Sequence, residues 1–281
     1  MNRILLLIAT MGILISTTVS CSNDDEPNRD DRLVTINTAM VNHMVNTANG
    51  EVLGFTTTQN KLVIDPAKHT ASLEMVYNGD TTRLKDITAT RKEDQPVFFL
   101  SSVSDPSFSG YVDVYEGTSI RYRYITGDGI RVISTTPEVF FLKTSSTIVY
   151  DDMTPTTTTE ETRYQFVIQP AGQKATVQVE QIVHDKDLKY FENITANNVP
   201  ITVTSNGFAI SGEDLPTTAI YRAFNDSTGS YKMTTNKYPF KTFNATVDLV
   251  NDRLDATFMM GASATVTATG RTYPDYRGIN W

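Results

Sequence analysis

Residues 62–75 read LVIDPAKHTASLEM, and residues 166–179 read FVIQPAGQKATVQV. The apolar positions, the proline and the alanine of the two stretches coincide at a constant spacing of 104 positions. Around each proline, apolar and polar residues alternate with the period of two that is typical of a strand with one buried face. The proline falls where it can preset the φ angle of a tight turn. Each stretch therefore predicts an antiparallel β-hairpin.

The alternation also predicts which side chains point into the core. The side chains expected on the buried face are Ala71, Leu73, Met75 and Tyr77 in the first copy, and Ala175, Val177 and Val179 in the second. A fainter third copy, VDLVNDRLDATFMM at residues 247–260, has Asn251 and Asp252 at its turn and places Ala256, Phe258 and Met260 on one face.

The similarity extends beyond the hairpins. Residues 86–89 (DITA) match residues 193–196 (NITA), with the spacing grown to 107 positions. Several matched segments at a nearly fixed spacing indicate an internal duplication. The stretch from Val34 to Val45 has mixed periodicity and does not favour a helix. We therefore predict an all-β chain of two tandem antiparallel domains, each a β-sandwich or an open barrel.

The repeat divides the body into residues 32–136 and residues 137–281, with the boundary placed at Pro137. The threonine-rich tract from Thr154 to Glu161 resembles a linker by composition. In the register of the repeat, however, the tract falls inside the second copy, so we expect a long loop there rather than a domain boundary.

The N-terminus reads as an export signal. Arg3 precedes a mostly apolar stretch from Ile4 to Ile15, and small residues lead to Cys21, the single cysteine of the chain. Twelve residues suit the apolar region of a signal peptide and are too few to span a bilayer as a helix. An unpaired cysteine in an exported protein calls for an explanation, and lipidation of the thiol supplies one.

This arrangement resembles the signal of bacterial lipoproteins, and of Bacteroidota lipoproteins in particular. It differs from the usual pattern in having Thr18 where leucine is expected. The resemblance implies that residues 1–20 are removed and that Cys21 anchors the mature chain to a membrane through its lipid. Residues 21–31 would then form an acidic linker to the first domain.

The acidic residues after the cysteine resemble the surface-export signal of the same lipoproteins. The residues concerned are Ser22, Asn23, Asp24, Asp25 and Glu26. The resemblance implies an outer-membrane lipoprotein exposed at the cell surface. A solvated linker on a periplasm-facing lipoprotein is the alternative. The body looks like the lipocalin-like lipoproteins of these bacteria in strand count and hairpin style.

Composition excludes several partners. The formal net charge is −8, and removing residues 1–20 makes it more negative by one because Arg3 is the only charged residue among them. Nucleic acid and anionic headgroups prefer a basic face, so we expect no nucleic-acid partner. Roughly 250 residues remain, enough for a substantial core without disulfides.

No motif predicts catalysis or a cofactor. The three histidines, His43, His69 and His184, lie far apart and lack metal-ligand spacing. Asp151-Asp152 and Asn251-Asp252 lack the spacing of a calcium loop and favour turns. Neither Gly117-Thr118-Ser119 nor Gly261-Ala262-Ser263 has the second glycine of a nucleophile elbow. We therefore predict neither a metal nor a cofactor, and no enzyme, although two carboxylates that pair only in space would leave no motif.

Two aromatic stretches are candidate ligand sites. In residues 119–124, SIRYRY, the alternation places Tyr122 and Tyr124 on one face and the two arginines on the other. Exposed tyrosines would form a platform for sugar rings, whereas buried ones would leave Arg121 and Arg123 in solvent. At the C-terminus, Tyr276 and Trp281 predict either a binding site or a tail that closes the sheet.

Two tripeptides resemble the acceptor of Bacteroidota O-glycosylation, namely Asp80-Thr81-Thr82 and Asp226-Ser227-Thr228. The preferred functional hypothesis is a lipid-anchored surface protein that binds glycans. The alternatives are a structural or adhesive protein that engages protein partners, a secreted hydrolase, and a lipocalin-like carrier.

Overall fold

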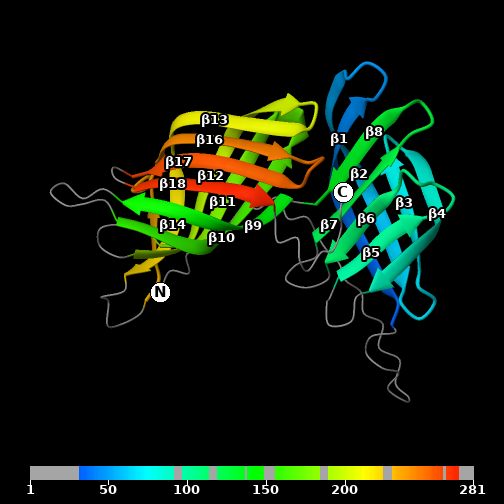
Figure 1. The fold of residues 1–281 in the computed structure, drawn as a ribbon, viewed down its shortest axis with the longest axis horizontal. Helices are drawn as coiled ribbons and strands as arrows, with labels where there is room; N and C mark the ends of the chain where they lie inside the picture. The colour runs from blue at the N-terminus through cyan, green and yellow to red at the C-terminus, as the bar shows by residue number, and fades with distance from the viewer. Residues whose placement is uncertain are drawn as a thin grey trace, which may run out of the picture.

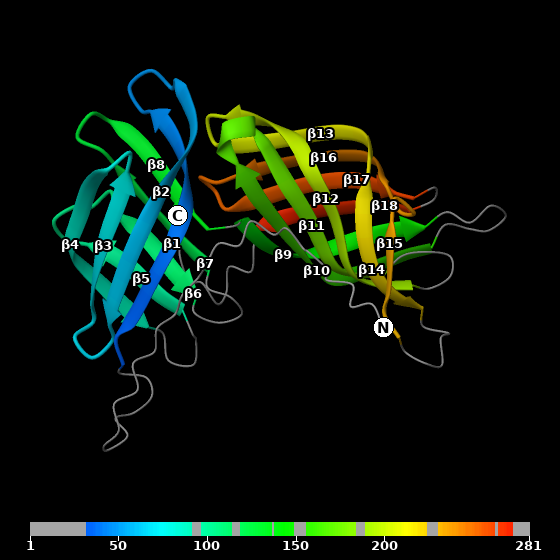
Figure 2. The ribbon, with the colours of Figure 1, turned by 180° about the vertical axis from the view of Figure 1, so that it is seen from behind.

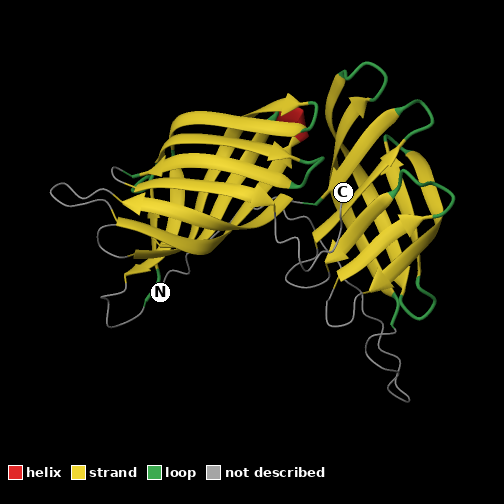
Figure 3. Cartoon of the chain, in the orientation of Figure 1, coloured by secondary structure: helices red, strands yellow, loops and turns green. Residues whose placement is uncertain are grey.

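The computed structural model describes residues 32–91, 97–113, 119–136, 138–148, 156–183, 189–223, 230–261 and 264–271. Within these ranges the regular structure is β-strand apart from one 3-10 turn, η2 (Pro170–Gly172) (Figure 3). The strands form two separate antiparallel sheets. The prediction of an all-β chain with two β domains is confirmed.

The first sheet contains β1 (Val34–Asn46), β2 (Val52–Asp65), β3 (Thr70–Tyr77), β4 (Asp80–Arg91), β5 (Val97–Ser102), β6 (Ser109–Asp113), β7 (Ser119–Ile125) and β8 (Ile130–Thr135). Each strand pairs with the next along the chain, and β8 pairs with β1 to close a barrel (Figures 1 and 2). We call this unit the first barrel. An eight-stranded up-and-down barrel encloses room for side chains or for one small ligand.

The second sheet contains β9 (Glu138–Ile148), β10 (Thr156–Gln169), β11 (Lys174–Val183), β12 (Lys189–Thr204), β13 (Gly207–Leu215), β14 (Thr217–Ala223), β15 (Lys232–Thr235), β16 (Phe240–Asp248), β17 (Arg253–Met260) and β18 (Ala264–Arg271). It is a curled ten-stranded sheet in which β11 also pairs with β12. Through that pairing the ladder runs around eight strands and returns from β18 to β9. The remaining two strands, β14 and β15, branch from β12. We call the ring of eight strands the second ring.

The repeated stretches form equivalent hairpins, β2–β3 and β10–β11. In the first, the backbone N–H of His69 donates to the carbonyl of Pro66, and in the second that of Gln173 donates to Pro170, both at 3.2 Å. His69 and Gln173 both have positive φ angles, 54° and 45°. The two turns therefore have the same geometry at the spacing that the sequence indicates.

The predicted match of residues 86–89 with residues 193–196 is wrong. Ile87 pairs with Ala71, whereas the residue opposite Ala175 is Val199. Each pairing contains a bulge at the same place, after Ala71 in β3 and after Ala175 in β11. Because β11 and β12 are longer than β3 and β4, the structural spacing is wider than the one the DITA and NITA letters suggest.

The expected loop in the threonine-rich tract is also wrong. From Thr156 onwards the tract belongs to β10, and its residues pair with β9, for example Thr156 with Ile148 and Glu161 with Lys143. Threonine is β-branched and packs well on a pleated sheet, so a polar threonine run is compatible with a strand. Composition alone misassigned it.

The buried faces follow the predicted alternation. Ala71, Leu73 and Met75 are at most 8% exposed, and Ala175, Val177 and Val179 are fully buried. Tyr77 is the exception, because it is 47% exposed at the end of β3. In the third copy Ala256, Phe258 and Met260 are buried as expected.

Candidate functional site

The interior of the first barrel contains a hydrogen-bonded polar layer that crosses it between its two ends. Its four residues come from strands β1, β2, β7 and β8, and each is at most 4% exposed; they are Asn42, Asn60, Tyr122 and Ser134. Asn60 Nδ2 donates to the Tyr122 hydroxyl, which is hydrogen-bonded to Ser134. Ser134 Oγ in turn donates to Asn42 Oδ1. We call this layer the polar floor.

Tyr122 can occupy the floor because its neighbour on β6 has no side chain. A Cβ atom at Gly110 would lie 2.7 Å from the Cβ of Tyr122 and 2.7 Å from the carbonyl oxygen of Arg121. The Phe108 ring stacks on Tyr122 with centroids 5.9 Å apart. The Tyr124 ring lies 6.2 Å away. The Tyr122 ring is therefore packed against two other aromatic rings.

Above the floor, six inward-facing side chains are reached by solvent, whereas Phe108 and Val132 at the same end are buried. Met44, Thr56, Thr58, Leu84 and Tyr124 are half-buried, and Thr82 is exposed. Asn42 Nδ2 donates from the floor to Thr58 Oγ1 at 3.1 Å, which joins the two layers. We call this set of six residues the open end; it lies on the side of the hairpin turns that follow β1 and β7, near the top of Figure 1.

Below the floor the barrel is closed. Most inward-facing residues there are apolar, and eight of them are at most 2% exposed: Ile36, Leu62, Ile64, Leu73, Ile87, Leu100, Val112 and Ile120. The interior thus has one end whose side chains are accessible to solvent, a hydrogen-bonded polar floor and a buried, mostly apolar base, and we call this arrangement the cup.

The side chains of the floor and of the open end are uncharged. Among the described residues, the inward positions of the floor and the open end are occupied by amides, hydroxyls, phenols and apolar side chains. Burial raises the pKa of Tyr122 and also that of Tyr124, so both phenols stay neutral near neutral pH. Such a lining can donate and accept hydrogen bonds and stack rings, but it offers no charge to an ionic ligand.

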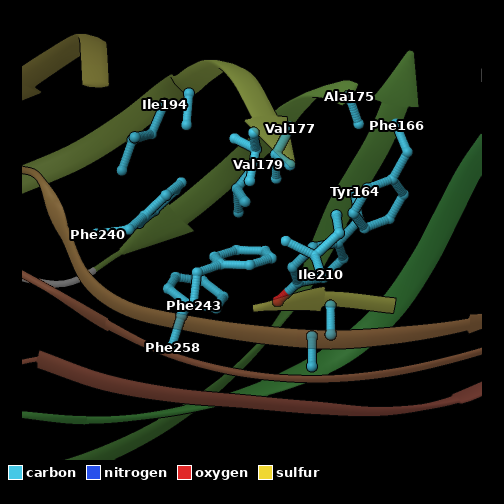
Figure 4. Close-up of a cluster of buried hydrophobic side chains, with 14 of the residues drawn as sticks. Tyr164, Phe166, Ala175, Val177, Val179, Ile194, Ile210, Phe240, Phe243 and Phe258 are labelled. Carbon is cyan, nitrogen blue, oxygen red and sulfur yellow. The ribbon is translucent and has the colours of Figure 1, made fainter. Parts of the chain in front are cut away.

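The side chains described at the centre of the second ring are mainly aromatic rather than polar. Phe240, Phe243 and Phe258 lie with ring centroids 5.1–5.2 Å apart (Figure 4). Tyr164 meets Phe258 edge to face at 6.5 Å. These four rings are at most 1% exposed. Close-packed rings of this kind form a stable core.

The structure places Tyr122 and Tyr124 in the cup rather than on a surface. Tyr122 is fully buried, so Tyr122 and Tyr124 form no exposed platform. The alternative, with both arginines in solvent, is also wrong, because Arg121 is only 1% exposed. Tyr276, Trp281, Cys21 and residues 22–26 lie outside the described residues. Asp80, Thr81 and Thr82 are exposed at the start of β4, whereas residues 226–228 lie outside the described residues.

Arg121 points from the first barrel into the second domain. Its guanidinium pairs with Asp252 at 2.6 Å and donates to the carbonyl of Leu249, both in the β16–β17 turn. Arg131 donates to the carbonyl of Ser205 in the β12–β13 turn. Val41, Phe55 and Ile133 add apolar contacts with the core of the second ring. These contacts join the two domains along the outer face of β1, β2, β7 and β8, and we call them the junction.

His43 lies fully buried in the junction. Its Nε2 is 2.8 Å from the carbonyl oxygen of Thr204, and since a carbonyl only accepts, Nε2 carries the hydrogen. The Nδ1 atom is buried without a hydrogen-bond partner, and the ring lies 5.3 Å from Phe55. Burial lowers the pKa of His43, and the nearby Arg131 cation lowers it further, against a smaller opposing effect of the Thr204 hydrogen bond.

The free energy of unfolding is therefore expected to fall as the pH drops from about 7.5 to about 5.5. Above the unfolded-state pKa of about 6.5, His43 is neutral in both states, so the stability is unaffected. Below it, the unfolded chain binds a proton that the folded junction excludes, which costs up to about 1.4 kcal/mol per pH unit. Urea unfolding at the two pH values measures the loss. His43→Gln should flatten the dependence, and an equal slope in both proteins would contradict it.

The described residues contain no group of three or more histidine, cysteine or acidic side chains that could hold a metal ion. His69 is exposed at its turn, and Asn251 and Asp252 form a turn. In the same part of the chain, none of the segments is a helix of the length and apolarity that a membrane crossing needs.

Sequence reasoning missed Asn42, Asn60, Thr56, Thr58 and Ser134. A signal was present, because each is a polar residue at a position where strand alternation predicts an inward side chain. A single such residue indicates only an interruption of the apolar alternation. Closure of the barrel brings β1, β2, β7 and β8 together, and only then do these polar residues form one group.

No protein-family model matches the chain, and no curated protein matches it. A solved structure from Bacteroides fragilis, described provisionally as an outer membrane protein, matches with 14% sequence identity and a TM-score of 0.32. The match covers 85% of this chain and 96% of the other.

Proposed function

We propose that this protein is a lipid-anchored binding protein of the outer membrane, and that it takes a neutral, hydroxyl-rich ligand at the open end of the first barrel. A glycan end is the preferred ligand class. The observation that carries the proposal is the gradient of exposure along the inward face of that barrel, from the accessible Tyr124 and Thr56 to the buried floor at Tyr122.

The chemistry of the lining supports a saccharide over an ion or a simple hydrocarbon. The hydroxyls of Thr56, Thr58 and Thr82 can exchange hydrogen bonds with sugar hydroxyls, and the Tyr124 ring offers a face for the apolar side of a pyranose. A small number of convergent polar groups among apolar and aromatic side chains is typical of small-ligand sites. The uncharged side chains of the floor and the open end favour a neutral ligand.

The other hypotheses rank below this one. A carrier of apolar molecules would need its ligand to pass the polar floor to reach the apolar base. A hydrolase would need two carboxylates facing a shared space, and neither the floor nor the six residues of the open end include one. The anchor rests on the N-terminal sequence, and metabolic labelling with palmitate, with Cys21→Ser as control, tests it.

Binding of the protein without residues 1–21 to a broad polysaccharide and host-glycan panel tests the proposal, followed by calorimetry on any hit. Tyr124→Ala is expected to weaken binding at least about tenfold, equivalent to about 1.4 kcal/mol. The matched control is Tyr231→Ala, which removes an exposed tyrosine, 55% accessible, from the second domain.

A saturable hit that depends on Tyr124 and not on Tyr231 supports the proposal. If no glycan in the panel binds, the glycan class is contradicted. Binding of a long-chain alcohol instead of a glycan favours a carrier. Loss of binding in the Tyr231 variant alone would move the site to the second domain.

A further inference from the structure

The hairpin β14–β15 is an addition to the plan that the two domains share. In the first barrel a short loop, residues 103–108, connects β5 to β6. At the corresponding place in the second ring, between β13 and β16, the chain forms β14 and β15 before it returns. The ring closes without these strands, because β13 pairs directly with β16. Closure of the ring therefore does not account for the hairpin.

The two faces of the hairpin differ. Ala219 and Tyr221 of β14 face the core of the second ring and are at most 8% exposed. On the opposite face, Ile220 pairs across the hairpin with Met233. These residues are 37% and 60% exposed, and Tyr231 beside them is 55% exposed. Three large apolar side chains thus lie together on the solvent side of a two-stranded branch.

The hairpin also ends in a sheet edge. Within the described residues, β15 pairs with β14 on one side and with no strand on the other. An edge strand presents alternate N–H and C=O groups that another extended chain can match, and recognition by strand addition uses such an edge with neighbouring side-chain contacts. The exposed apolar side chains next to this edge supply those contacts.

We propose that β15 is a docking edge for an extended, acidic segment of another protein, which adds to the sheet as a further strand. Strands β14 and β15 contain the cations Arg222 and Lys232 and no aspartate or glutamate, in a chain of net charge −8. Opposite charges on directly paired strands are favourable, so an acidic side chain opposite Lys232 fits this edge.

Other occupants match the edge less well. A second copy of this chain would place its own Arg222 and Lys232 close to those of the first copy along the shared edge. A bilayer would accept Ile220, Tyr231 and Met233 but would leave the backbone groups of β15 without partners. An extended polypeptide with alternating apolar and acidic residues satisfies the backbone, the apolar face and the charge together.

The test uses the protein without residues 1–21 and two labelled ten-residue peptides, one alternating valine with glutamate and the other valine with lysine. Fluorescence anisotropy is expected to show at least about tenfold tighter binding of the acidic peptide, a difference of about 1.4 kcal/mol. Lys232→Glu should reverse the preference. Met233→Asp should weaken binding of the acidic peptide about tenfold, whereas the control Val103→Asp, at an 88% exposed position of the first barrel, should not.

Reversal by the Lys232 variant supports charge-matched strand addition at this edge. Equal binding of the two peptides, or binding of neither, overturns it. Concentration-dependent dimerisation that is lost in the Met233 variant also overturns it, because the edge would then bind a second copy. Vesicle binding that depends on Met233, without peptide binding, overturns it as well. These outcomes are independent of glycan binding at the first barrel.

Discussion

Asp252→Ala is expected to destabilise the protein by about 3–5 kcal/mol. The substitution leaves the Arg121 guanidinium inside the junction without its carboxylate partner. The two side chains are 2% and 9% exposed, so little solvent is available to replace the lost charge. Breaking one half of a buried ion pair is costly because the remaining charge stays desolvated. Thermal and urea unfolding measure the loss.

Two controls separate the charge from the contact. Asp252→Asn keeps an oxygen acceptor for Arg121 and removes the charge, so it should lose less stability than the alanine variant. Arg253→Ala breaks the neighbouring exposed pair with Asp255, in which both side chains are more than 40% accessible, and should change stability little. A loss as small for Asp252→Ala as for Arg253→Ala would show that the junction admits water and does not hold the domains as described.

Phe258→Ala is expected to cost about 3–5 kcal/mol, through lost burial and the cavity that remains. Phe258 is 1% exposed and contacts the rings of Phe240 and Phe243 at 5.1 and 5.2 Å (Figure 4). The neighbours come from β16, itself held between β13 and β17, so the backbone has little freedom to collapse into the space. Calorimetry of the whole protein measures the change.

The matched variant is Phe258→Leu, which retains most of the apolar volume and should lose clearly less. If the two domains unfold separately, the loss should appear in only one transition, and Asp252→Ala should affect both. A Phe258→Ala protein with unchanged unfolding would contradict the close packing of the three rings.

The hairpins are the part of the fold that sequence could predict. Their alternation, their proline turns and the inward set from Ala71 to Met75 depend on neighbours within a few positions, and such local signals survive in any tertiary context. The match of residues 86–89 failed because the second hairpin is longer, which shifts its return strand relative to the repeat without changing the letters. The prediction of a loop at Thr156 was wrong because composition indicates how polar a segment is, but not whether it pairs with another strand.

The candidate site shows the same division. The alternation correctly placed Tyr122 and Tyr124 on one face and Arg121 on the other. It could not assign those faces, since an arginine that faces a second domain and one that faces water have the same sequence spacing. Arg121 is buried because Asp252 and the carbonyl of Leu249, more than a hundred positions away, lie in the turn that meets it.

The sequence by itself determined the β class, the paired hairpins and the N-terminal pattern that predicts a lipid anchor, because each follows from local periodicity, turn chemistry or an uninterrupted motif. Only the tertiary structure decided that the first domain closes into a cup with a polar floor, that Arg121 and Arg131 contact the second domain at the junction, and that β15 has one unpaired edge among the described strands. Closure, docking and edges depend on which strands meet across long separations, and the pairing of distant backbones leaves no mark at any single position.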